Sequence, residues 1–128
     1  KILSKFRWPF FLGYVASLYV FFTLPSEDLP EAVFYANDNL LHFLAFLLLT
    51  LFSFQAFFPS RFSFFCREAG GKAAAFSAFY GAFLEWAQRG VPGRTGSFSD
   101  WVFDLLGVFL AVVIFRFSRL TKLVVRLD

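Results

Sequence analysis

The chain has 128 residues, of which 59% are hydrophobic and 16% are charged, and it carries 23 phenylalanines and a formal net charge of +3. A single domain of this length cannot bury so much apolar surface, which excludes an ordinary soluble globular protein. Long apolar runs indicate a lipid bilayer as the solvent. Membrane topology then explains the basic excess, so the composition does not predict nucleic-acid binding.

Four apolar runs predict four helices, over about residues 8–24, 39–58, 73–88 and 101–117. Pro9 opens the first run where the first turn of a helix tolerates proline, and Pro25 and Pro59 close the first and second runs. At about 1.5 Å per residue, these runs give helices of roughly 24–30 Å, which suffices to cross the hydrocarbon core of a bilayer. We therefore predict one all-α domain over residues 1–128, an integral membrane four-helix bundle.

The basic residues predict how this bundle is oriented. Three precede the first helix, three separate the second helix from the third, and four stand at the end of the fourth helix and after it: Lys1, Lys5, Arg7, Arg61, Arg67, Lys72, Arg116, Arg119, Lys122 and Arg126. The positive-inside bias makes that side cytoplasmic, so both termini are predicted to be cytoplasmic. A cleaved signal peptide is a competing interpretation of the first run, but the run is long for that role and no small-residue cleavage site follows it.

Acidic and polar residues gather at the opposite, outer ends of the last three helices. Asp38 and His42 are four positions apart and share a face of the second helix. Glu85 and Gln88 are three positions apart and share a face of the third helix. The helix ends therefore bring these polar groups toward one another.

Stripes of small residues indicate which faces of the helices pack together. One stripe on the third helix leads to Glu85, and one on the fourth contains two aspartates: Ala74, Ala78 and Gly81, and Asp100, Asp104, Gly107 and Ala111. Small side chains let membrane helices approach closely. We therefore expect Glu85 and Asp104 to point into the bundle and not at lipid.

The two remaining basic residues, Arg89 and Arg94, lie in a loop at this outer end, over residues 89–99. The glycines and the proline of the loop suit a tight turn whose backbone N–H groups can approach a bound group. Ser97 or Ser99 is expected to cap the fourth helix. The loop thus places two guanidinium groups above the polar helix ends.

Three segments resemble the VanZ-like family of small bacterial integral membrane proteins: DNLLHFLAF (38–46), EWAQ (85–88) and PGRTGSFSDWVFDLLG (92–107). The family pattern reads approximately P-G-R, then S-x-x-D, then N-x-x-G. This chain has Asp104 where the family usually has an asparagine, so donating a hydrogen bond from this position requires a protonated carboxyl. The resemblance implies a link to resistance against lipoglycopeptides such as teicoplanin. We expect the protein in the bacterial inner (cytoplasmic) membrane, where the topology predicted from the basic residues makes the polar site face outward.

We predict a ligand-binding site built from the outer polar groups: Asp38, His42, Glu85, Gln88, Arg89, Arg94, Asp100 and Asp104. The carboxylates outnumber the cationic groups, so some negative charge must be protonated, solvated or neutralised by a bound group. In a purely structural alternative, Arg94 pairs with Glu85 or Asp100 and holds the loop on the bundle. One imidazole and several carboxylates could hold Mg²⁺, Ca²⁺ or Zn²⁺, which keeps metal binding open. No ligand spacing is diagnostic, so neither a metal nor a cofactor is predicted.

Three functions fit this site. The favoured one is binding of a membrane lipid, lipid-linked precursor or lipid-tailed amphiphile whose phosphate or carboxylate meets the arginines. One alternative is an integral membrane enzyme that acts on a lipid-linked headgroup, with His42 or Glu85 as candidate acid or base. The other is a non-catalytic scaffold for a larger membrane partner. The sequence leaves open whether a reaction is catalysed, and it identifies no protein partner.

Overall fold

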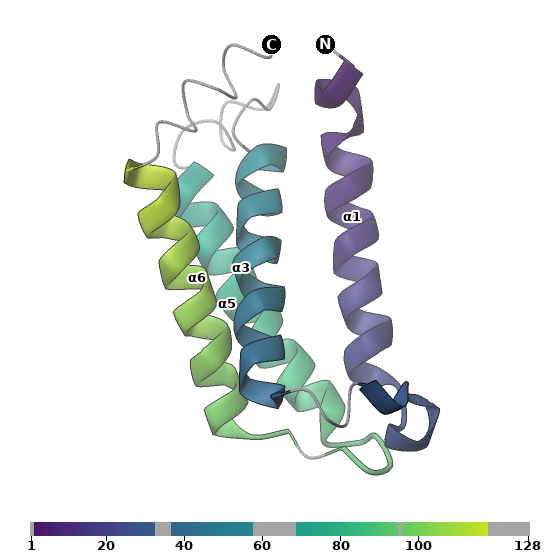
Figure 1. Ribbon diagram of the computed structural model, residues 1–128. Coiled ribbons are helices and arrows are strands. Elements are labelled where there is room, and N and C mark those ends of the chain that lie inside the picture. Colours follow the sequence, from purple (N-terminus) through teal and green to yellow (C-terminus); the bar gives the residue numbers. More distant parts are fainter. Residues whose placement is uncertain (1, 33–36, 58–68, 95, 118–128) are drawn as a thin grey trace.

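The structure is a computed structural model that describes residues 2–32, 37–57, 69–94 and 96–117. These residues form a helical bundle (Figure 1) with the elements α1 (Ile2–Thr23), the short 3₁₀ helix η1 (Ser26–Asp28), α3 (Asp38–Phe57), α5 (Ala69–Gln88) and α6 (Phe98–Phe117). No strand occurs within the described ranges. The prediction of an all-α fold is therefore confirmed.

The first helix differs most from its predicted bounds. α1 begins at Ile2, well before the apolar run, and Pro9 therefore lies inside the helix. Because proline has no N–H, the carbonyl of Lys5 loses its bond within the helix. A polar segment that the apolar run did not include thus extends the helix toward the chain start.

Side chains that precede α3 and α6 cap these helices. The Asn37 side-chain oxygen accepts a hydrogen bond of 3.3 Å from the Leu40 N–H. The Ser97 hydroxyl accepts one of 3.2 Å from the Asp100 N–H, which confirms that one of the two expected serines caps the last helix. Such caps satisfy N–H groups that have no partner within the helix. They fix where both helices start, and so fix the height of the polar groups in their first turns.

α3 packs against α1, α5 and α6 (Figure 1). The start of α1, the end of α3, the start of α5 and the end of α6 lie together at one end of the bundle, at the top of Figure 1. The other end holds η1, the start of α3, the end of α5 and the start of α6. We call it the polar end, because the polar residues singled out in the sequence lie there.

The basic residues that the structure describes follow the predicted division. Lys5, Arg7 and Lys72 lie in the first turns of α1 and α5, away from the polar end, whereas Arg89 and Arg94 follow α5 at the polar end. Outside the described residues or side chains are Lys1, Arg61, Arg67, Arg116, Arg119, Lys122 and Arg126. The orientation of the bundle in a membrane stays a prediction.

Aromatic and aliphatic side chains fill the interior below the polar end. Phe46 and Leu49 of α3 are fully buried, and Phe54 of α3 stacks on Phe115 of α6 with ring centroids 4.1 Å apart. Hydroxyl groups tie α1 to its neighbours: Tyr14 donates 2.8 Å to the Ala45 carbonyl of α3. These contacts fix the positions of α1 and α6 relative to α3.

Gly107 sets the distance between α3 and α6. A Cβ at this position would collide with the Phe43 carbonyl oxygen and would lie 2.9 Å from the Leu47 backbone nitrogen. Both atoms belong to the α3 backbone, which cannot yield as a flexible side chain can. Ala111, one turn further along the expected stripe, is fully buried. The small-residue stripe of the last helix therefore lies in a packed interface, as predicted, and the structure shows that its partner is α3.

Two helices of the described chain are long and apolar enough to cross a membrane, namely Asp38–Phe57 and Phe98–Phe115. Only 44% and 28% of the apolar segments of these two helices are buried in the bundle, whereas the core helix of a soluble protein would be mostly buried. Large apolar side chains face outward along the bundle, among them Phe79 at 78% and Phe109 at 68% exposed. Such a surface suits lipid better than water.

Candidate functional site

His42 lies at the centre of the polar end, where α3 meets α6. It is 2% exposed, and its Nδ1 lies 2.8 Å from Oδ1 of the fully buried Asp104. We assign the proton of this hydrogen bond to Nδ1, because an ionised carboxylate can only accept. The ring of Phe22 packs on the imidazole with centroids 4.7 Å apart. Both contacts fix the orientation of the imidazole.

Two further carboxylates flank the imidazole. Glu85 Oε1, from α5, lies 3.8 Å from His42 Nδ1, and Asp100 Oδ2, from α6, lies 3.8 Å from Nε2. Glu85 and Asp100 are each only 7% exposed. The second oxygen of Glu85 accepts a hydrogen bond of 2.8 Å from the Ser97 N–H at the start of α6. Three helices therefore converge on one histidine, as the faces shared in the sequence predicted.

Several buried oxygens at this end have no hydrogen-bond partner within the described chain: Glu85 Oε1, Gln88 Oε1 and Asp104 Oδ2. A buried acceptor without a partner costs about 1–3 kcal/mol, and more when it is charged. Gln88 is 3% exposed and so belongs to the interior of the polar end, although no hydrogen bond connects its side chain to the cluster. The site thus offers more acceptors than its own donors satisfy.

Glycines allow the close approach of the three helices. A Cβ at Gly81 of α5 would lie 3.0 Å from Asp104 Oδ2 and 3.3 Å from the Trp101 ring. A Cβ at Gly96 would collide with the Glu85 backbone carbonyl. The missing side chain at Gly81 lets the Asp104 carboxylate lie beside the α5 backbone, and the missing side chain at Gly96 lets the loop backbone lie beside the backbone of α5 at Glu85.

Asp38 stands at the rim of the cluster. It is the first residue of α3 and is exposed, in contrast to the buried His42 one turn below. Ligand atoms of Asp38, His42 and Asp100 all lie within 4.8 Å of one another, and the same holds for His42, Glu85 and Asp104. The cluster is therefore continuous from the exposed rim to the buried Asp104.

Arg94 does not pair with the cluster as the structural alternative expected. Its Nε donates a hydrogen bond of 3.1 Å to the Leu24 carbonyl, and its Nη2 donates one of 2.8 Å to the Phe21 carbonyl. The last carbonyls of a helix have no partner within the helix, so a guanidinium that reaches them is stabilised there. Burial lowers the pKa of Arg94, and the negative charge of Asp38 partly offsets this effect. Arg94 therefore fastens the loop to the end of α1.

A further contact supports this fastening. The Ser26 N–H donates 3.3 Å to the Pro92 carbonyl, and Gly93 adopts a φ of +73° beside Ser26. A Cβ at Gly93 would collide with the Ser26 hydroxyl. The loop is thus held against η1 and α1, as well as against α5 and α6.

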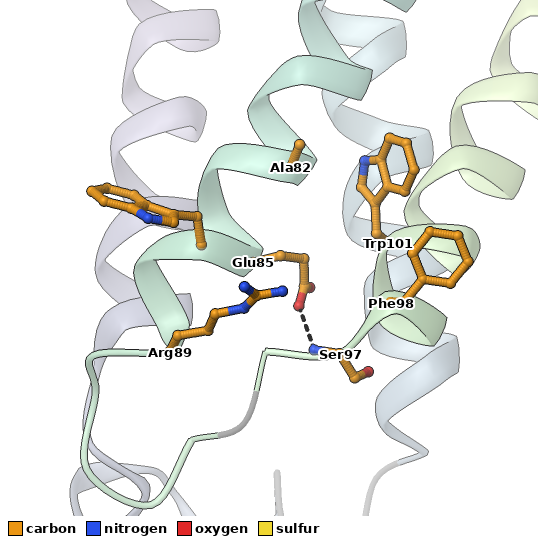
Figure 2. Close-up of a pocket in the computed structure, with 7 residues that line it drawn as sticks. Ala82, Glu85, Arg89, Ser97, Phe98 and Trp101 are labelled. Atoms are coloured by element: carbon orange, nitrogen blue, oxygen red, sulfur yellow. Dashed lines mark hydrogen bonds between the residues drawn. The ribbon is translucent and has the colours of Figure 1, made fainter.

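A pocket of about 200 Å³ lies beside the cluster, between the end of α5 and the start of α6. Its lining residues are Ala82, Glu85, Trp86, Arg89, Ser97, Phe98 and Trp101. In Figure 2, Glu85 of α5 and Arg89, directly after α5, face Ser97, Phe98 and Trp101 across the pocket. Glu85 is buried and Arg89 is exposed, so the pocket links the acidic cluster to the surface.

The aromatic lining was not predicted from the sequence. Trp86 and Phe98 are 69% and 74% exposed. The Trp101 indole N–H donates 3.1 Å to the Ala78 carbonyl, which bridges α6 to α5. In an apolar run these rings look like any lipid-facing aromatic residue. Only the position of Trp101, directly after Asp100 in the first turn of α6, could have indicated from the sequence that this ring lies near the polar cluster.

The fold and the site together define a small helical bundle with a lipid-compatible surface and a buried histidine–carboxylate cluster at one end. The VanZ/LLP1 family model matches residues 11–119, which include all of α3, α5 and α6. The chain belongs to the VanZ/LLP1 family, and the resemblance noted in the sequence is confirmed. No curated protein and no solved structure matches the chain.

Proposed function

We propose that this VanZ-like chain is a multi-pass protein of the bacterial cytoplasmic membrane that binds the headgroup of a lipid-linked or lipid-tailed amphiphile in the outer leaflet. Both termini are inside, and the polar end faces outward. The observation that carries the proposal is the pocket in which the exposed Arg89 and the buried Glu85 stand beside exposed aromatic rings. Family membership supports a role in the cell envelope, which we extend to glycopeptide resistance of the teicoplanin type.

The chemistry of the pocket suits an amphiphile with an anionic headgroup. The guanidinium of Arg89 can bind a phosphate or carboxylate through two parallel N–H groups. Glu85, which already accepts from Ser97, can also accept hydrogen bonds from the hydroxyl or amide groups of a sugar or peptide. Trp86 is an exposed residue of a type enriched at membrane interfaces, and the exposed ring of Phe98 adds apolar surface to the pocket. The apolar chain of the ligand would then lie along α5 and α6.

Native mass spectrometry of the protein released from mild detergent tests this proposal. The variants are Arg89→Gln and, as a control, Lys5→Gln, which removes the same charge from an exposed residue at the opposite end. A charge-assisted hydrogen bond contributes about 1.5–3 kcal/mol, so Arg89→Gln should weaken the affinity for the lipid roughly 10- to 100-fold and lower the fraction of protein that retains it. Equal retention of the same lipid by all three proteins would refute the proposal.

Growth in teicoplanin tests the physiological part of the proposal. Cells that express the wild type or Lys5→Gln should tolerate more teicoplanin than cells that express Arg89→Gln at the same membrane level. Identical tolerance in all three strains would contradict a role of this pocket in resistance.

The buried imidazole favours one further function, catalysis on a bound headgroup. His42 with Asp104 forms a pair in which the carboxylate orients the ring, and Glu85 lies within reach of the same ring. Such a pair serves in general acid and base catalysis. If the chain is an enzyme, His42→Gln should retain lipid but abolish its conversion. An unchanged lipid profile in wild-type membranes would exclude this alternative.

A further inference from the structure

The two ring nitrogens of His42 have different surroundings. Nδ1 donates to Asp104 at 2.8 Å, so in the neutral ring Nε2 carries only a lone pair. The nearest carboxylate oxygen on that side, Asp100 Oδ2, is 3.8 Å away, beyond hydrogen-bond distance. Within the described chain no group donates to Nε2. The acceptor nitrogen of this buried side chain therefore faces carboxylate oxygens, and a positive group between them, either a proton on Nε2 or a bound cation, stabilises the arrangement.

The described basic residues do not supply that group. Arg94 is occupied by the carbonyls of Phe21 and Leu24, and Arg89 is exposed at the pocket. Asp100 and the deeper Asp104 are nine-tenths or more buried. Charges in such surroundings are costly unless a counter-charge is present.

We propose that His42 Nε2, Asp38 and Asp100 bind a divalent transition-metal cation at the polar end. The three ligand atoms lie within 4.8 Å of one another, and ligands about 2.0–2.2 Å from a metal lie roughly 3.3 Å apart in a tetrahedron. The exposed Asp38, at the first position of α3, can close this difference by side-chain rotation. One imidazole and two carboxylates suit Zn²⁺ or Mn²⁺ better than Mg²⁺ or Ca²⁺, which prefer oxygen ligands alone.

Asp104 would orient the metal ligand. Metal-bound histidines almost always donate their other ring N–H to a carboxylate or carbonyl, which fixes the tautomer. The Nδ1–Oδ1 contact of 2.8 Å already provides this partner. The second group of possible ligands, His42 with Glu85 and Asp104, would require this bond to break. The Nε2 side is therefore the site of the cation.

Three protein ligands leave coordination positions open toward the rim, where Asp38 is exposed. Such a cation could take water or an anionic oxygen as its next ligand. The metal site does not depend on the proposed function, because it is defined by protein groups alone.

Titration of the chelator-treated protein in detergent with ZnCl₂ and MnCl₂ tests the proposal. Calorimetry gives the affinity, and Co²⁺ absorption spectra report whether nitrogen is among the ligands. The first variant is Asp100→Asn, which removes one ligand charge, and the control is Asp28→Asn, the same change at an exposed residue of η1. We expect one site in the wild type and in Asp28→Asn, and at least tenfold weaker binding in Asp100→Asn.

A second variant keeps the test decisive if Asp100→Asn prevents folding. Asp104→Asn retains an oxygen acceptor for Nδ1 but removes the negative charge. The variant should therefore bind the cation roughly 10- to 100-fold more weakly, with the three ligands still in place. Binding that is equal in the wild type, Asp100→Asn and Asp104→Asn would overturn the proposal, as would the absence of binding in the wild type. The assay measures cation binding to protein groups and not lipid binding, so its failure would not affect the amphiphile proposal.

Discussion

Gly107 offers the sharpest test of the packing that builds the site. An alanine Cβ at this position would collide with the Phe43 carbonyl oxygen and lie 2.9 Å from the Leu47 nitrogen. Because both atoms are backbone, α6 must move away from α3. Overpacking of this kind costs about 1–3 kcal/mol. Gly13, in α1, has nothing within 4 Å of its own Cβ position, so Gly13→Ala should instead stabilise the helix by about 0.5–1 kcal/mol.

The two substitutions should change the free energy of unfolding in opposite directions, which makes the comparison specific for the α3–α6 contact. Reversible unfolding in mixed detergent micelles, followed by circular dichroism, gives the free energy of unfolding of both variants. We expect the free energy of unfolding of Gly107→Ala to be lower than that of the wild type, and that of Gly13→Ala to be higher. If Gly107→Ala were as stable as the wild type, or if both variants moved in the same direction, the close α3–α6 contact would be wrong.

Substitutions at two further residues, Asp104 and Arg94, probe the polar end. Asp104→Asn keeps an oxygen acceptor for His42 Nδ1 and should change the free energy of unfolding by less than about 1 kcal/mol, whereas Asp104→Ala leaves a buried N–H without a partner and should cost about 1–3 kcal/mol. Unfolding in the same micelles measures both, and equal losses would show that the charge, not the hydrogen bond, matters. Arg94→Gln should raise amide exchange in residues 90–94 and at the end of α1, because the bonds to the Phe21 and Leu24 carbonyls are lost. Hydrogen exchange that is unchanged relative to wild type would contradict the fastening role of Arg94.

Helical periodicity and small-residue stripes predicted much of the site. The spacing of Asp38 and His42, and the stripe that contains Asp104 and Gly107, depend only on positions along one helix. Each of these four residues lies at the α3–α6 contact or at its rim in the structure. A period along one helix shows which residues share a face, and small side chains show which face can approach a neighbour.

Contacts that depend on the path of a loop could not be predicted in this way. Arg94 has a charge that the sequence matched to nearby carboxylates, yet its donors go to carbonyls of α1, which are unmarked in any sequence. The Ser97 N–H that binds Glu85 is likewise a backbone group. Phe98 and Trp101 gain their place at the pocket only because α5 ends beside the start of α6.

Site-specific photocrosslinking tests the central claim that the polar end binds an amphiphile headgroup. A photoreactive phenylalanine analogue replaces either Phe98, at the rim of the pocket, or Phe109, on the same helix away from it. The two side chains are 74% and 68% exposed, so both should contact membrane lipid to a similar extent. The phosphatidylcholine vesicles contain a short-chain prenyl phosphate, whose chain is too short to span the roughly 16 Å from position 98 to position 109. We predict strong crosslinking of the prenyl phosphate from position 98 that falls in the Arg89→Gln background, and only background crosslinking from position 109. Equal crosslinking from both positions would contradict the claim.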